Sequence, residues 1–356
     1  MQPDATGARQ PRTPAAPRLD LLFALATCWM IGGAYLDSWA HNHLPELESF
    51  FTPWHAVLYS GFLASATALL ASFVRNLRRG HSWRTAVPAG YGLSLIGLLI
   101  FAGGGVGDAF WHELFGIETG VEGALSATHQ LLDLGTVFLV AGPFRAAWYR
   151  VDAGSASVPG PWRAYLPLVL SLIVTLATLV LISQIAHPFT RTLATVDFAP
   201  RGERELFNNQ VLGIVSVMLQ TGLLMGTLLL AIRRWGQRLP AGTMTLLLVV
   251  TGVAILVMDD EYRFVPALLV AGGVAEVLFR WLRPSATRIA SARIYAAAVP
   301  AVLYGLYFVT LGLTDQIWWR VHTLSGAIAA AAATGLLLSV LAVPAASPGG
   351  ATYPSE

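Results

Sequence analysis

The chain has 356 residues, of which 55% are hydrophobic and only 12% are charged, and its mean hydropathy is +0.61. Soluble domains carry roughly 25% charged residues, so this composition excludes an ordinary soluble globular protein. The 22 basic residues are all arginine and are balanced by 20 acidic ones, which gives no reason to expect a nucleic-acid partner. A single cysteine, Cys28, excludes disulfides within the chain and a thiolate-rich metal site.

Apolar runs of about bilayer length recur along the chain and predict an all-α, polytopic membrane helix bundle built from repeated helical hairpins. We place ten spans at residues 19–40, 54–73, 87–110, 126–148, 162–186, 207–232, 243–258, 264–279, 294–313 and 321–343. The seventh and eighth are short, so a tilted or re-entrant pair there would change the count. The Pro- and Ala-rich residues 1–18, and residues 344–356, are predicted to be disordered tails.

The arginines predict how the chain is oriented. Seventeen of the 22 fall in the N-terminal tail or in alternate loops, at residues 75–84, 145–163, 233–238 and 280–293. The positive-inside rule then predicts a multi-pass protein of the bacterial inner membrane with both termini in the cytoplasm. Seven of the eight histidines lie at the opposite, periplasmic face, and only His81 is cytoplasmic. We therefore look for chemistry at the periplasmic ends of the helices.

Two consecutive hairpins repeat one arrangement of an Asp, a His four residues later and a His at the start of the next helix. The two sets are Asp37, His41 and His55, and Asp108, His112 and His129, with offsets 108−37 = 71, 112−41 = 71 and 129−55 = 74. Residues at i and i+4 share a helix face, so each Asp and His should point together and meet the His across the hairpin. A carboxylate with two imidazoles suits Cu, Zn, Mn or non-haem Fe.

The sequence therefore predicts a duplicated metal-binding four-helix unit at residues 19–148, followed by further transmembrane helices at 149–343. Interfacial Asp, His and Trp can also simply anchor helices at the headgroups, but the repetition favours metal ligands. Polar residues expected to support the ligands, or in one case to complete a site, are His43, Glu113, Glu122, Asp133 and His322. Trp39, Trp54, Phe110 and Trp111 are expected to form a dry aromatic wall, or else an ordinary interfacial belt.

At these residues the chain resembles a metal-binding integral membrane component of the copper membrane monooxygenases, the particulate methane and ammonia monooxygenase family. That component carries Asp-x-x-Trp-His, then Phe-Thr-Pro-x-His, then a second hairpin with Asn, His and His. The present chain has Phe51-Thr-Pro-Trp-His55 intact, with Ala40 in place of the family's Trp, while Asp-x-x-Trp-His occurs in the second hairpin at Asp108. The similarity covers about residues 19–148.

The resemblance implies that Asp37, His41 and His55 match the family's first copper set. It also implies that Asp108, His112 and His129 match the second, with Asp108 in the position of the Asn. Copper would then be the cofactor, with zinc or iron as alternatives. Further membrane subunits or a periplasmic copper protein would be partners, besides the lipid bilayer.

Three functions are open on this sequence. The first is a copper-dependent, monooxygenase-like oxygenase that acts on a small apolar substrate reaching the site through the bilayer. The second is a zinc-dependent membrane hydrolase in which Glu113 or Glu122 acts as general base. The third is a copper transport or assembly factor, although the six methionines form no Met-x-x-x-Met ladder of the kind that suits Cu(I).

Overall fold

The computed structural model describes residues 14–44, 52–116, 121–150 and 161–343. These residues are almost entirely helical and include no β-strand, only two isolated bridges. Nine of the described helices are long and apolar enough to cross a membrane. The prediction of an all-α polytopic membrane bundle is therefore confirmed.

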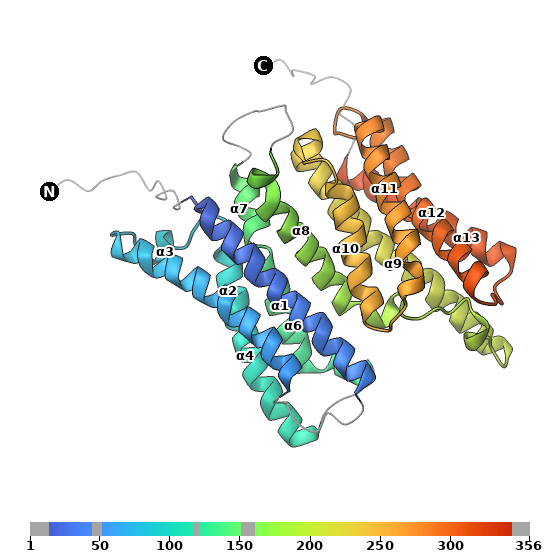
Figure 1. Ribbon diagram of the computed structural model, residues 1–356, viewed down its shortest axis with the longest axis horizontal. Coiled ribbons are helices and arrows are strands. Elements are labelled where there is room, and N and C mark those ends of the chain that lie inside the picture. Colours follow the sequence, from blue (N-terminus) through green and yellow to red (C-terminus); the bar gives the residue numbers. More distant parts are fainter. Residues whose placement is uncertain (1–13, 45–51, 117–120, 151–160, 344–356) are drawn as a thin grey trace, which may run out of the picture. The chain divides into compact units, whose positions relative to one another are not determined.

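The contacts divide the chain into two compact units. The first contains the helices α1 Pro17–His43, α2 Pro53–Arg78, α3 Trp83–Ala86, α4 Gly92–Phe115, α5 Val121–Leu125, α6 Ala127–Val140, α7 Gly142–Arg150 and α8 Trp162–Ile182 (Figure 1). Helix α1 packs along α2, α4 packs along α6, and α8 packs against α1, α6 and α7. The fifth span thus belongs with the four helices that carry the repeated motif.

The second unit contains the helices α9 Glu203–Trp235, α10 Thr243–Val257, α11 Val265–Leu282, α12 Ile289–Thr314 and α13 Val321–Ala342. Helix α13 packs against both α9 and α12, and α11 packs on α12. The seventh predicted span is α10, which has 15 residues and is about 22 Å long at 1.5 Å per residue. It is shorter than the roughly 30 Å hydrocarbon core, and it is the one predicted span that is not among the nine long helices.

Local sequence sets where the hairpin helices begin. Thr52 and Ser126 precede α2 and α6, and each side-chain oxygen accepts a hydrogen bond from the backbone N–H three residues later. Pro53 occupies the first turn of α2, where a missing N–H costs nothing. Gly116 ends α4 with φ of 83°, a conformation that glycine adopts without strain.

Glycines allow the two helices of the first hairpin to approach closely. A Cβ atom at Gly33 of α1 would lie 2.7 Å from the backbone of Leu58, and one at Gly61 of α2 would lie 2.4 Å from the backbone nitrogen of Met30. Both distances are too short for any side chain. The α1–α2 crossing therefore depends on these two residues being glycine.

The second hairpin repeats this packing at the equivalent positions. A Cβ at Gly104 of α4 would lie 3.2 Å from Leu132, and one at Gly135 of α6 would lie 2.6 Å from the backbone nitrogen of Phe101. The offsets are those of the motif, 71 on the first helix (33 to 104) and 74 on the second (61 to 135). The duplication thus extends from the polar motif to the helix contacts beneath it.

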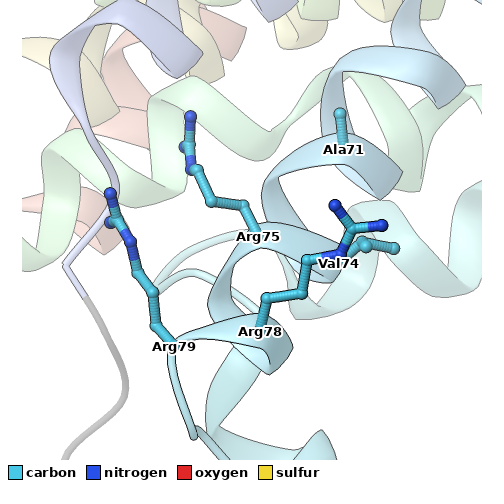
Figure 2. A pocket seen from close by; sticks show the side chains of 5 residues that line it. All are labelled: Ala71, Val74, Arg75, Arg78 and Arg79. Carbon is cyan, nitrogen blue, oxygen red and sulfur yellow. The ribbon is translucent and has the colours of Figure 1, made fainter.

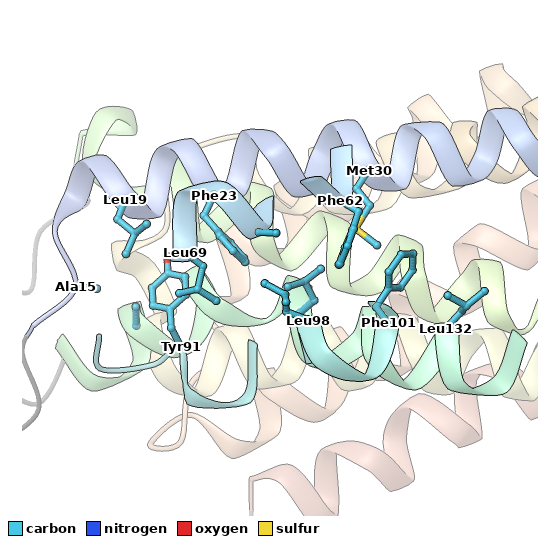
Figure 3. Packing of buried hydrophobic residues seen from close by; sticks show 13 residues of the cluster. Ala15, Leu19, Phe23, Met30, Phe62, Leu69, Tyr91, Leu98, Phe101 and Leu132 are labelled. Atoms are coloured by element: carbon cyan, nitrogen blue, oxygen red, sulfur yellow. The ribbon is translucent and has the colours of Figure 1, made fainter. Parts of the chain in front are cut away.

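The apolar core of the first unit lies among α1, α2, α4 and α6 (Figure 3). Phe23 and Tyr91 are fully buried there, with ring centroids 5.1 Å apart in an edge-on contact. The Tyr91 hydroxyl donates a 2.6 Å hydrogen bond to the buried carboxylate of Asp20, which also pairs with Arg150. This network joins the start of α1, the start of α4 and the end of α7.

Candidate metal centre

The first cluster lies where α1 ends and α2 begins. Asp37 and His41 lie one turn apart on α1, and His55 lies in the first turn of α2. The Oδ2 atom of Asp37 lies 3.8 Å from Nε2 of His41 and 3.3 Å from Nε2 of His55. One ligand atom from each residue falls within 4.8 Å of the other two, so the three could hold one metal ion.

The second cluster has the same construction at the end of α4 and the start of α6. The carboxylate of Asp108 lies 3.4 Å from Nε2 of His112 through Oδ2 and 3.8 Å from Nε2 of His129 through Oδ1. The two imidazole rings lie 5.9 Å apart and are inclined at 65°, against 5.8 Å and 68° in the first cluster. The structure therefore brings both predicted triads together with nearly identical geometry.

Helix-capping hydroxyls orient one histidine in each cluster. The side-chain oxygen of Thr52 lies 3.1 Å from Nδ1 of His55, and that of Ser126 lies 2.6 Å from Nδ1 of His129. When Nδ1 carries the proton and donates it to the hydroxyl, the Nε2 lone pair points at the cluster. Sequence reasoning missed these two residues, although a Ser or Thr three positions before a helix-starting His is a visible N-cap pattern.

The carboxylates of Asp37 and Asp108 differ in the hydrogen bonds that they accept. Asp108 is 1% exposed, and its Oδ1 atom accepts a 2.8 Å hydrogen bond from Thr128. Trp54 stands at the equivalent position of the first hairpin (128−74 = 54) and offers no hydroxyl. Correspondingly, Oδ1 of Asp37 is buried and has no hydrogen-bond partner among the described residues. A buried carboxylate oxygen left without a donor is costly, and a bound cation would remove that cost.

The two clusters lie near each other. They are close enough for charges in one to act on groups in the other. The carboxylate of Asp37 interacts electrostatically with that of Asp108, and His41 interacts with His112 and His129. Tyr59 belongs to the same region, because its ring lies 6.2 Å from that of His55 and its hydroxyl packs against α4 one turn before Asp108. Sequence periodicity carries no signal for this proximity, because it arises from the packing of one hairpin on the other.

The other candidate residues lie outside the two triads. His43 is exposed and stacks on Trp39 one turn before it, Glu113 is exposed, and Asp133 is half-buried one turn beyond His129. The side chain of Glu122 is outside the described part of the structure. His322 is exposed at the start of α13, in the second unit.

The predicted aromatic wall is present only in part. Trp39 and Trp54 meet edge to face beside the first cluster, with ring centroids 6.2 Å apart. Phe110 is 66% exposed and points away from the protein interior, and Trp111 packs on Phe115 of its own helix. The first cluster is therefore flanked by a pair of tryptophans in contact. Near the second cluster, the aromatic side chains of α4 form no corresponding pair with α6 among the described residues.

One more buried histidine, His187, follows α8 in the second unit. Its Nδ1 atom accepts a hydrogen bond from the backbone N–H of Phe189 at 3.1 Å. Burial lowers the pKa of His187 to about 3, because a charged imidazole would lose its hydration there. This histidine is therefore neutral, and its hydrogen bond from Phe189 stabilises the turn after α8.

Each triad offers two imidazole nitrogens and a carboxylate oxygen to one ion and leaves further coordination positions for other ligands. That donor set fits Cu, Zn or non-haem Fe and does not identify the metal. The chain matches none of the protein families, curated proteins or solved structures with which it was compared. The functional argument therefore rests on the geometry of the two clusters.

Proposed function

We propose that this chain is an integral membrane metalloprotein whose two Asp/His/His clusters bind copper, and that it acts as an oxygenase on a small apolar substrate. The observation that carries the proposal is the convergence of both triads, each with its ligand atoms within 4.8 Å of one another. The motif similarity to the copper membrane monooxygenases supports the choice of copper.

The chain's own residues prepare the sites for an ion. Asp37 and Asp108 provide negative charge in low-dielectric surroundings, where it attracts a cation strongly. The hydroxyls of Thr52 and Ser126 hold His55 and His129 in place, so the ligands need little rearrangement on binding. The orphaned oxygen of Asp37 is a further place for a cation to be coordinated.

Access from the bilayer favours an apolar substrate. Val106 and Phe110 of α4, on either side of Asp108 in the sequence, are 61% and 66% exposed. At about 100° per residue these two side chains lie on the face of α4 opposite Asp108, so they offer an apolar molecule a surface on this helix without lining the cluster itself. Bound copper would supply dioxygen activation, and the reaction would need two electrons from a partner such as a periplasmic copper protein.

The distribution of arginine supports an inner-membrane location with both termini in the cytoplasm and the clusters at the periplasmic face. The hydrolase alternative gains no support from Glu113, which is exposed rather than directed at His112. The transport alternative gains no support from the methionines. Met30, on the same helix as Asp37, is fully buried in the apolar core and offers no exposed sulfur ligand.

The first test is metal content, measured by mass spectrometry on protein purified in mild detergent. We expect about two copper ions per chain, one of which is lost in His41→Ala/His55→Ala and the other in His112→Ala/His129→Ala. His81→Ala, an exposed histidine outside both clusters, is the matched control and should keep both ions. Absence of metal from the wild type, or equal metal in all variants, would overturn the metal sites; zinc in place of copper would overturn the oxygenase.

The second test separates the reaction from metal binding. Copper-loaded protein with a chemical reductant is incubated under ¹⁸O₂ with short alkanes and alkenes, and products are analysed for labelled alcohols. We expect label in the product of the wild type and none in either double variant. Protein that holds copper but forms no labelled product from any substrate would refute the oxygenase and leave the metal sites standing.

A further inference from the structure

The end of α2 remote from His55 carries a cavity that the metal sites do not explain. The cavity has a volume of about 440 Å³ and is lined by Ala71, Val74, Arg75, Arg78 and Arg79 (Figure 2). Arg75 and Arg79 extend to one side of the helix, and Arg78 extends to the other beside Val74. Three guanidinium groups therefore surround one hollow within little more than a helical turn.

Among the described residues, no acidic side chain balances the positive charge of this cavity. The sequence has no acidic residue between Glu48 and Asp108, and within the described ranges none of the three arginines forms an ion pair. Asp20 begins the neighbouring helix, but its carboxylate already pairs with Arg150 and accepts the hydroxyl of Tyr91. The partial negative charge at a helix C-terminus is only about half an elementary charge, so three guanidinium groups exceed it and the cavity attracts anions.

The cavity also has an apolar part that lies deeper along the helix. Ala71 and Val74 are exposed and precede the arginines, so Ala71 lies about 10 Å from Arg78 toward the middle of α2. Apolar side chains on the membrane side and guanidinium groups at the helix end correspond to the two parts of a phospholipid. Arginine is suited to the phosphate group because its planar fork donates two parallel hydrogen bonds.

We infer that this cavity binds the headgroup of an anionic phospholipid, with the phosphate on Arg75, Arg78 and Arg79 and the acyl chains along Ala71 and Val74. The inference stands apart from the two clusters, because the first lies at the other end of α2 and the second lies at the end of α4 and the start of α6. A free phosphate ion would use the same guanidinium groups but could not use the apolar side chains. The lipid and the soluble anion are therefore distinguishable by experiment.

The test is a lipid titration of the purified full-length protein in detergent, read by native mass spectrometry. We expect dioleoyl phosphatidylglycerol to bind at least tenfold more tightly than dioleoyl phosphatidylcholine. A basic residue near an anionic lipid contributes about 1 kcal/mol, so Arg75→Gln/Arg78→Gln/Arg79→Gln should weaken phosphatidylglycerol binding roughly 100-fold. Arg78→Gln alone should weaken it about fivefold, which keeps the test informative if the triple variant fails to fold.

The matched control is Arg191→Gln/Arg201→Gln/Arg204→Gln, which removes the same charge from exposed positions in the second unit. It should leave phosphatidylglycerol binding unchanged. Equal weakening in both triple variants would mean a net-charge effect and would overturn the site. Displacement of the lipid by inorganic phosphate at equal concentration would overturn the lipid assignment, because the acyl chains would then contribute nothing.

Discussion

Replacing Ser126 by alanine tests whether the capping hydroxyls orient the metal ligands. The Ser126 oxygen has three contacts, a 3.3 Å hydrogen bond from the backbone N–H of His129, a 2.6 Å contact to its Nδ1 atom and a 3.4 Å contact to the hydroxyl of Thr128. The first is longer than the usual 2.9–3.0 Å of such bonds, and the second is short. We therefore expect the substitution to affect the position of the imidazole more than the stability of α6.

The magnitudes follow from these contacts. Loss of an N-cap costs about 0.5–2 kcal/mol, and the long backbone contact places Ser126→Ala at the lower end, about 0.5–1 kcal/mol. Loss of the group that orients a metal-bound histidine typically weakens metal affinity 10–100-fold, which corresponds to about 1.4–2.7 kcal/mol. Metal affinity at the second site should thus fall by more than the stability of the metal-free protein.

The assay uses a chain with one working site. In a His41→Ala/His55→Ala background only the second cluster remains, and its copper affinity is measured by competition with a chelator of known affinity. Ser126→Thr serves as control because it retains the hydroxyl. The free energy of unfolding without metal is measured in parallel, so that the loss of the cap and the loss of ligand orientation are separated.

The reasoning fails if Ser126→Ala binds copper as tightly as Ser126→Thr in this background. It also fails if the loss of affinity does not exceed the loss of stability, because the hydroxyl would then act only as a helix cap. The reciprocal variant, Thr52→Ala in a His112→Ala/His129→Ala background, should reproduce the effect at the first site, where both contacts are 3.1 Å.

Three further outcomes follow from the structure. Because the pKa of His187 falls to about 3 in the folded protein, the unfolded chain binds more protons than the folded one between about pH 6.5 and 3. The free energy of unfolding should therefore drop as the pH falls through this range. Thermal unfolding measured against pH should show a smaller drop in His187→Gln than in the wild type. Gly61→Ala should destabilise the protein by about 1–3 kcal/mol through overpacking, whereas Gly32→Ala, which has open space around it, should not, as chemical denaturation can show. Tyr91→Phe should lower the free energy of unfolding by about 1.5–3 kcal/mol, since it removes a hydrogen bond to a buried carboxylate; an unchanged value would mean that the arginine alone satisfies that carboxylate.

Much of the helical architecture could be predicted from the chain, because apolar runs of bilayer length allow few alternatives to a helix. The two triads could be identified because their spacing is local, with i and i+4 on one helix and the next ligand at the following helix start. The short length of α10 could also be predicted, because the apolar run at residues 243–258 is itself short. These features depend on neighbours in sequence, which periodicity reports directly.

The features that could not be predicted depend on contacts between distant segments. Nothing in the sequence around Asp20 announces that it meets Tyr91 and Arg150, 71 and 130 residues away. The proximity of the two clusters and the place of Tyr59 near both arise from packing of α2 against α4. The capping residues Thr52 and Ser126 are an intermediate case, because their pattern was present in the sequence and was overlooked.

The confinement of each triad to a single hairpin has a consequence for biosynthesis. Only 18 residues separate Asp37 from His55 (55−37), and 21 separate Asp108 from His129 (129−108). Short segments of this kind close at little entropic cost. All residues of the first cluster and both of its helices have been synthesised once residue 78 is added, before any residue of the second cluster has been translated. The two clusters are therefore expected to become competent for metal one after the other, while the chain is still emerging from the ribosome.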